Sequence, residues 1–453
     1  MLRGFTKFCV NLASRWLPDS FVLVAIPTVF AFLAVLGFTE QTSLHIIQNW
    51  GNGVWSLLAF SMQMALILVL GQALASAKII SNILQRLADI PKNYFSAIVM
   101  VSLLGMLANI INWGFGLVIS AIFAKEIAKK VDNVDYRLLI AAAYSGFVVW
   151  HGGLSGSIPL TLASGGEALA KSTAGILTES IPTSMTIFST YNLIILGIII
   201  CVLPFLLAAI HPAKNEVVVI DKKLLEKENK EVEMIDHKHD KTLAVYLENS
   251  FLVSLSISLI GFIYIANHFA KGGGLSLDIL NMIFLFLGIL LHKKPSSYIK
   301  AINESAKNAA GILLQFPFYA GIIGMMVGTA ENGGQSLASM LSHFFISIAN
   351  ADTFAVFSFL SAGFVNILVP SGGGQWAVQA PVMIPAGLKL GIDPSVTAMA
   401  IAWGDAWTNM IQPFWALPAL AIAGLGAKDI MGYCVITLLF TGVVISCGFF
   451  FLI

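Results

Sequence analysis

The sequence predicts an all-α polytopic membrane protein made of two inverted-topology repeats, each with a re-entrant helical hairpin and an unwound span. Three observations predict this fold class: an apolar composition, the placement of Lys and Arg, and a weak internal repeat. Of the 453 residues, 57% are hydrophobic and only 11% are charged, whereas soluble domains carry about 25% charged residues. So few charges cannot cover a water-facing surface of this size, so we expect a lipid bilayer around the chain.

Apolar segments of membrane-spanning length recur along the chain, since a transmembrane helix needs about 20 mostly apolar residues. These segments are 20–38, 55–76, 138–158, 186–210, 246–267, 276–292, 308–328, 396–417 and 431–453. Two further apolar regions, 94–124 and 353–390, are interrupted by Asn, Gly and Pro. Because these residues break or cap helices, each region is interpreted as a pair of half-helices.

The positive charges predict how the chain is threaded, because cytoplasmic loops collect Lys and Arg. The chain has 25 Lys and Arg residues. All of them except Lys171, Lys271 and Lys389 lie near the N-terminus, in the segments 77–93, 125–137, 211–244 and 293–307, or in the loop at 428. With a cytoplasmic N-terminus, those three lie outside only if 94–124 returns to the cytoplasm and 353–390 returns to the outer face. The charges therefore predict two re-entrant hairpins that enter from opposite faces.

A weak internal repeat supports the same threading. A shift of about 257 residues aligns Asn109 with Asn366 and Trp150 with Trp407. Inverted repeats with broken helices near the midplane are typical of secondary transporters. The predicted divisions are an amphipathic surface helix 1–17, a first repeat 18–210, a cytoplasmic linker 211–244, a connecting transmembrane helix 245–270 and a second repeat 271–453.

The two hairpin tips are the predicted substrate site, and we expect them to approach each other near the midplane at Asn112 and Ser371. Broken helix inside a membrane is tolerated only where it is buried in protein or lines a cavity. Asn amides, glycine backbone and a helix N-terminus all suit a carboxylate, although the same residues could simply cap or break helices. The predicted substrate-binding residues are Asn112, Trp113, Gly114, Ser371, Gly372, Gly373, Gln375, Trp376, Thr408 and Asn409.

The stretches 144–157 and 403–413 are interpreted as spans unwound at their middle, where carbonyl and side-chain oxygens suit Na⁺. An ionisable residue inside a span is costly and usually functional, so Asp405 is expected to carry a proton or to help hold Na⁺. A purely structural acid is the alternative. The predicted coupling-ion residues are Asn109, Ser155, Asn366, Asp405 and Gln412. His151 could bind a ligand, relay protons or lie near the outer surface, and no role is assigned to it.

The sequence contains no recognisable catalytic triad, metal cluster or nucleotide motif, so we expect neither an enzyme nor a cofactor nor a nucleic-acid partner. An H⁺ or Na⁺ gradient is the expected energy source. An anion channel is the second class considered, although channels usually repeat by oligomeric symmetry around an open pore.

The chain resembles the bacterial short-chain fatty acid transporters of the acetoacetate and butyrate uptake type, which belong to the ion-transporter superfamily of secondary carriers. The segments that carry the resemblance are 14–19, 111–116, 369–374, 412–418 and 421–434. The resemblance implies a scaffold domain plus a transport domain, a homodimer, elevator motion and a place in the bacterial cytoplasmic membrane. It also implies a small monocarboxylate as substrate, with dicarboxylates as the alternative.

Overall fold

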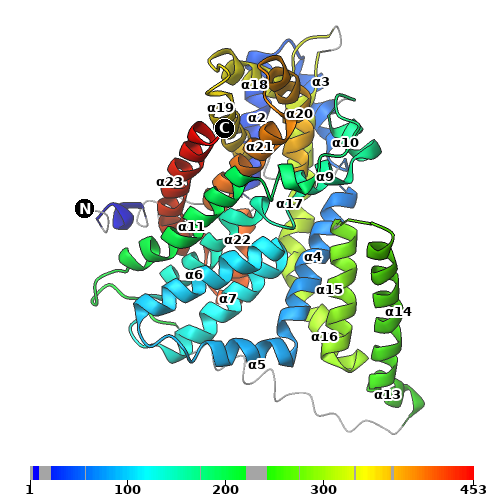
Figure 1. Ribbon diagram of the computed structural model, residues 1–453, viewed down its shortest axis with the longest axis vertical. Coiled ribbons are helices and arrows are strands. Elements are labelled where there is room, and N and C mark those ends of the chain that lie inside the picture. The colour runs from blue at the N-terminus through cyan, green and yellow to red at the C-terminus, as the bar shows by residue number, and fades with distance from the viewer. Residues whose placement is uncertain are drawn as a thin grey trace.

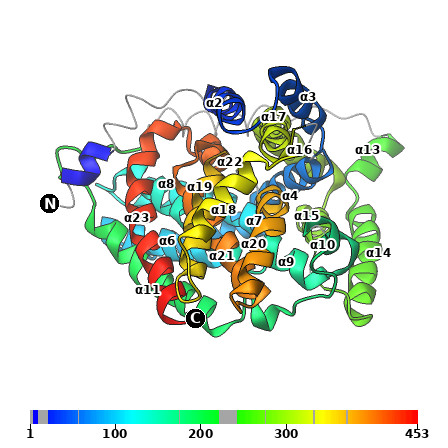
Figure 2. The ribbon, with the colours of Figure 1, turned by 90° about the horizontal axis from the view of Figure 1, so that it is seen from above.

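The computed structural model describes residues 4–9, 22–56, 58–173, 175–220, 242–274, 276–330, 333–368 and 372–453. These residues form helices joined by turns and loops, with no β-strand among them. In both views of Figures 1 and 2, α13 and α14 lie at one edge of the molecule and α11 and α23 at the opposite edge. The predicted all-α class is therefore confirmed.

A first group of helices is built around α4 and α17, which contact each other and most other members of the group. The group comprises α2 (Val22–Phe38), α3 (Ser43–Gly53), α4 (Leu58–Ser76), α5 (Lys78–Leu87), α13 (Leu243–Glu248), α14 (Phe251–Ala270), α15 (Leu277–His292), α16 (Pro295–Ala306), η3 (Lys307–Ala309) and α17 (Ala310–Val327). α14 forms its outer edge, and Leu252, Leu259 and Ile260 are exposed on it. Exposed apolar side chains of this kind suit contact with lipid tails.

A second group surrounds α6 and α21. It comprises α6 (Tyr94–Ile111), α7 (Trp113–Lys130), α8 (Tyr136–Ser145), η1 (Gly146–Gly152), α9 (Ser157–Ser164), α10 (Gly166–Ser172), η2 (Thr183–Met185), α11 (Thr190–Ala209), α18 (Leu337–Ser347), α19 (Phe354–Leu368), α20 (Gly372–Lys389), α21 (Pro394–Thr408), η4 (Asn409–Ile411), α22 (Pro413–Ala423) and α23 (Ala427–Phe451). The α-helix gives way to 3₁₀ geometry at η1 and η4, which lie inside the two stretches predicted to be unwound.

α19 and α21 cross at a short distance. A Cβ atom added at Gly404 would lie 2.5 Å from the Cβ of Ala362 and 2.5 Å from the carbonyl oxygen of Phe359. Only glycine lets two helix backbones approach this closely. The crossing brings Asp405, the next residue of α21, against α19 and into the interior of the second group.

Five helical segments are long and apolar enough to cross a membrane by themselves. They are Tyr94–Ile111, Tyr136–Ser164, Thr190–Ala209, Phe251–Ala270 and Ala427–Phe451. The count among the described residues rises to six if α4 and α5, which bend by 70°, form one broken span. α2, α15 and α19 are apolar but shorter, with 17, 16 and 15 residues.

The predicted half-helix length is wrong for the region 94–124. α6 and α7 have 18 residues each, which is about 27 Å at 1.5 Å per residue, close to the thickness of a bilayer core. The helix break is confined to Asn112, because this one residue is both the C-cap of α6 and the N-cap of α7. α7 then continues past residue 124 to Lys130.

The predicted linker 211–244 is not wholly a free connector, because its first residues bind the start of α8. The amide of Val218 donates to Asp135 Oδ2 at 2.9 Å, and the amide of Tyr136 donates to the carbonyl of Val218 at 2.7 Å. The predicted connecting helix begins as α13, and α14 starts anew at Phe251. Residues 221–241, Ser371 and most of the predicted surface helix 1–17 lie outside the described residues.

Candidate functional site

The junction between α6 and α7 holds the loop that follows η1. The amide of Trp113 donates to Ser155 Oγ at 2.9 Å, and the amide of Leu154 donates to the carbonyl of Ile110 at 2.7 Å. Asn112 accepts from the amide of Phe115 at 2.9 Å and thereby caps α7. The predicted residues Asn112, Trp113 and Ser155 are therefore brought together, with Asn112 in a capping role.

Two residues of this predicted tip face neighbouring helices. A Cβ atom at Gly114 would lie 2.3 Å from the side chain of Ile67, so this glycine lets α7 approach α4. The Trp113 ring is buried against Trp150 and Trp415, with centroids 6.1 and 5.3 Å away. Asn109 lies one turn back in α6, where its amide donates to the carbonyl of Gly105 at 2.7 Å.

The equivalent part of the second half centres on Asn366 in α19. Its Nδ2 lies 2.8 Å from the carbonyl of Asp405, 2.9 Å from Thr408 Oγ1 and 2.8 Å from Asn409 Oδ1. Gln412 Nε2 donates in turn to the carbonyl of Asn366. The structure therefore joins five predicted residues into one buried network: Asn366, Asp405, Thr408, Asn409 and Gln412.

This network contains oxygen atoms that lack a donor. Asn366 Oδ1, Asp405 Oδ1 and Gln412 Oε1 are buried and have no hydrogen-bond partner within the described part of the chain. A buried polar atom without a partner costs about 1–3 kcal/mol. Buried oxygens of this kind can accept a proton or, for the amides, coordinate an alkali cation.

The two halves of the chain meet at His151. Its Nδ1 lies 3.0 Å from Asp405 Oδ2, and both side chains are fully buried. On the opposite edge of the ring, Nε2 lies 3.0 Å from Ser157 Oγ and accepts from the amide of Ile158 at 3.4 Å. The ring also stacks on Trp150 at a centroid distance of 3.8 Å. η1, α9 and α21 thus hold one imidazole in a single orientation.

The contacts of Ser157, His151 and Asp405 follow the order of a hydrolase triad, which the sequence analysis did not recognise. The first residue of α20 covers this arrangement. A Cβ atom at Gly372 would lie 2.5 Å from both His151 Cε1 and Ser157 Oγ. In this conformation the α20 backbone lies against the serine hydroxyl, so an acyl group cannot reach it.

The other described residues predicted around the second tip point away from His151. Gln375 donates to the carbonyl of Ala362 at 2.7 Å and to Gln379 Oε1 at 2.8 Å, within the α19–α20 contact. Trp376 donates to Ser172 Oγ in α10 at 3.0 Å. Gly373 is half-buried in the first turn of α20. Of the four described residues, Gly372 is the one in contact with the imidazole.

Sequence reasoning missed Ser157 and the amide of Ile158, and it gave His151 no role. A signal was present: His151 is followed by glycines, by Ser155 and by Ser157, the first residue of the next helix. That pattern indicates a loop rich in hydrogen-bonding groups, but the partner on α21 is visible only in the fold.

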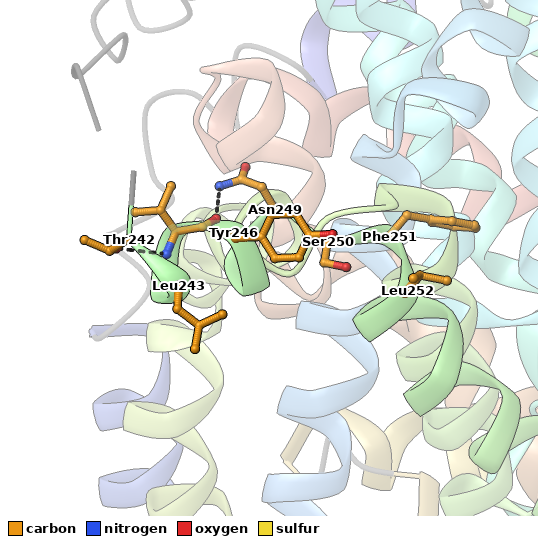
Figure 3. A pocket seen from close by; sticks show the side chains of 8 residues that line it. Thr242, Leu243, Tyr246, Asn249, Ser250, Phe251 and Leu252 are labelled. Carbon is orange, nitrogen blue, oxygen red and sulfur yellow. Dashed lines mark hydrogen bonds between the residues drawn. The ribbon is translucent and has the colours of Figure 1, made fainter. Parts of the chain in front are cut away.

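A surface hollow at α13 and the start of α14 is separate from this site (Figure 3). The described residues that line it lie between Thr242 and Leu252, and none of them is charged. Asn249 Nδ2 donates to the carbonyl of Val245 at 2.9 Å, which closes the short helix locally.

Comparison with known proteins identifies close relatives. The model of the short chain fatty acid transporter family matches residues 1–452. A protein of Escherichia coli (strain K12), provisionally described as a short-chain fatty acid transporter, is 44% identical over 449 residues, 99% of each chain. A Haemophilus influenzae protein with the same description is 43% identical over 461 residues, 100% of each chain.

Among solved structures, the YdaH transporter of Alcanivorax borkumensis is similar with a TM-score of 0.48 and 16% identity, over 96% of this chain and 97% of that chain. The family and its members are transporters and not enzymes. With its apolar helices, the chain is a multi-pass membrane protein that handles a small molecule. Its match to the family model over nearly its whole length shows that the chain belongs to the short-chain fatty acid transporter family.

Proposed function

We propose that the chain is a secondary active carrier of short monocarboxylates of the butyrate and acetoacetate type, driven by an H⁺ or Na⁺ gradient. The observation that carries the proposal is the contact between His151 and Asp405, at 3.0 Å and with both side chains fully buried. Ionisable groups inside a membrane are expensive and mark ion or substrate pathways. His151 belongs to the first half of the chain and Asp405 to the second. The junction between the two halves is where a carrier needs its coupling group.

Correspondence between the halves supports alternating access. Asn109 and Asn366 both lie near the end of the first helix of a helix pair, about 257 residues apart. Gly146 approaches Gly105 as Gly404 approaches Ala362, each with an added Cβ at 2.5 Å from its neighbour. In inverted repeats, matched crossings of this kind let one arrangement open to either side of the membrane.

The proposal includes an elevator mechanism. The second helix group, with His151 and Asp405, would be the transport domain. The first group, with the lipid-facing α14, would be the scaffold. A homodimer, a cytoplasmic N-terminus and hairpins that return to the face from which they enter complete the proposal. In it, the pair of His151 and Asp405 carries the coupled proton, because Nδ1 of the imidazole lies 3.0 Å from Asp405 Oδ2. A Na⁺ ion would instead use amide oxygens such as Asn366 Oδ1 and Gln412 Oε1.

The expected substrate is small and singly charged. A short apolar tail needs packing surface, which the buried Trp and Phe rings near His151 provide. One carboxylate can be held by hydroxyl and amide donors alone. A dicarboxylate would need a second set of donors, and the predicted substrate-binding residues Asn112 and Asn409 are the candidates for it.

Uptake by proteoliposomes tests this function. Labelled butyrate, acetoacetate and succinate are offered in turn, with an imposed proton gradient, an imposed sodium gradient or none, and protein-free liposomes measure passive entry. We expect saturable, gradient-dependent uptake of the two monocarboxylates. Ohmic conductance would refute the carrier, chemical conversion of the acids would refute a transporter, and preferred uptake of succinate would favour the dicarboxylate alternative.

A further inference from the structure

The hydrogen bonds around His151 fix which ring nitrogen carries the proton. The amide of Ile158 is directed at Nε2 at 3.4 Å, and a backbone N–H can only donate. Nε2 therefore presents its lone pair, and the ring proton lies on Nδ1. Nδ1 is 3.0 Å from Asp405 Oδ2, but the two atoms do not have the geometry of a hydrogen bond.

A second proton changes what the ring requires. A proton added to Nε2 would point toward the amide of Ile158, so two donors would face each other. Ser157 Oγ, 3.0 Å from Nε2, can accept only one of them well. A carboxylate has two oxygens that can accept from Nε2–H, from the amide and from the serine hydroxyl at once. The carboxylate therefore supplies the acceptor that the protonated Nε2 lacks, and the added proton supplies a donor for the carboxylate.

Two further observations place a ligand at this edge of the ring. Asp405 Oδ1 is buried without a hydrogen-bond partner among the described residues, so this oxygen can still accept a hydrogen bond or contact a positive charge. Gly372 at the start of α20 lies directly against Cε1 of His151 and Oγ of Ser157. The N-termini of α9 and α20 thus meet at the edge where the carboxylate would bind, and the positive end of a helix dipole favours an anion.

Other titratable groups lie on the elements packed against η1. α6 carries Tyr94; α7 carries Lys125, Glu126, Lys129 and Lys130; α8 carries Tyr136, Arg137 and Tyr144; α11 carries Tyr191 and Cys201; and α21 carries Asp405. The Tyr144 hydroxyl donates to the carbonyls of Asn409 and Gln412. The four charged residues of α7 lie in its last turns, whereas the junction with η1 lies at its start. Asp405 is the ion partner of the imidazole.

We propose that His151, Ser157 and the amide of Ile158 bind the carboxylate of the substrate, and that the coupled proton is carried on His151 Nε2. The proposal rests on the proposed function and deepens it. Substrate anion and proton bind as one unit, so the loaded site has no more net charge than the empty one. The start of α20 must move off His151 to admit the acid and return to enclose it. No covalent bond forms or breaks; the proton moves from water to Nε2 and is released with the acid.

The first experiment measures proton uptake on substrate binding by the purified wild-type protein. Butyrate is added to the protein in weakly buffered detergent solution that contains a pH indicator. We expect about one proton to be taken up for each butyrate bound, since the imidazole gains the proton that the anion then covers. Butyrate binding without proton uptake would overturn the proposal, and this result needs no variant to fold.

The second experiment compares variants in proteoliposomes. His151→Gln removes the titrating nitrogen, and Ser157→Ala removes one donor. The exposed His343 in α18 provides the matched control, His343→Gln. After subtraction of protein-free uptake, we expect His151→Gln to lose the dependence of uptake on external pH. Its KM for butyrate should rise roughly 10- to 100-fold, as for loss of a hydrogen bond between charged groups.

Ser157→Ala should raise KM less and keep the pH profile, and the control should match the wild type. A wild-type pH profile in His151→Gln would overturn the proposal while leaving the carrier function intact. No butyrate uptake by the wild-type protein would instead refute the proposed function, so the two failures are distinguishable.

Discussion

Gly153→Ala is expected to separate the loop after η1 from the junction of α6 and α7. Gly153 lies so close to Ile110 that an added Cβ would be 2.5 Å from its carbonyl oxygen, 2.7 Å from its Cα and 3.0 Å from its carbonyl carbon. All three are backbone atoms, which cannot rotate away as the end of a side chain can. The backbone at Gly153 has φ −108°, which alanine adopts without strain, so the clash alone decides the outcome.

The size of the effect follows from the required displacement. Moving the Cβ to an ordinary contact distance shifts the loop by about 1 Å, which stretches the Leu154–Ile110 hydrogen bond from 2.7 Å beyond the limit of a hydrogen bond. Overpacking costs about 1–3 kcal/mol and the lost bond about 1 kcal/mol more. We therefore expect a loss of about 2–4 kcal/mol, a large fraction of the stability of a typical protein.

Thermal unfolding of the purified protein in detergent, followed by tryptophan fluorescence, measures this loss. The matched control is Gly197→Ala in α11, where an added Cβ meets nothing within 4 Å. Alanine should be neutral or slightly stabilising there, since it favours helix over glycine. A Tm for Gly153→Ala equal to that of Gly197→Ala would refute the described packing of the loop on Ile110.

Three further predictions concern the site and Tyr298 in α16. Asp405→Asn should abolish gradient-driven butyrate uptake in a protein that still elutes as a folded species on size-exclusion chromatography. The control is Asp393→Asn, at the N-cap of the same helix. Normal H⁺ and Na⁺ dependence of uptake in Asp405→Asn would remove this carboxylate from the mechanism. Asn366→Ala removes a donor shared by three oxygens and should lower the free energy of unfolding by about 1–3 kcal/mol. Its Tm should therefore be lower than that of the control Asn267→Ala, at an exposed position of α14. Equal Tm values would contradict the network. Burial raises the pKa of Tyr298 in α16, so the folded chain holds this proton more tightly than the unfolded chain, and stability should fall as the pH rises above about 10. Tyr298→Phe should reduce that alkaline loss of Tm, and an unchanged pH dependence would contradict the burial.

Much of the candidate site could be predicted from the sequence. Asn112, Asn366 and Asp405 were singled out because polar residues inside apolar segments are costly and need a reason. The structure joins five of the predicted second-half residues in one network. In the structure Gly114, Gln375 and Trp376 contact α4, α19 and α10. Only helix packing determines these neighbours.

The length of the helices was also beyond the sequence pattern. Asn109, Asn112 and Gly114 all looked like breaks between half-helices, but α6 runs through Asn109 and α7 through Gly114. Asn109 remains helical because its amide bonds to the carbonyl of Gly105 one turn earlier. Gly114 remains helical because α4 packs against it.

Composition, apolar length and local breakers are properties of contiguous segments, so the sequence was enough to predict the membrane environment, the family and the regions in which helices break, although not each breaking residue. The tertiary structure alone decided that His151 meets Asp405 on one side and Ser157 on the other. That meeting depends on close helix crossings at Gly146 and Gly404, which bring distant segments within hydrogen-bond reach. Local periodicity records which face of a helix is apolar but not which partner covers it, so the residue left without a role in the sequence became the centre of the site.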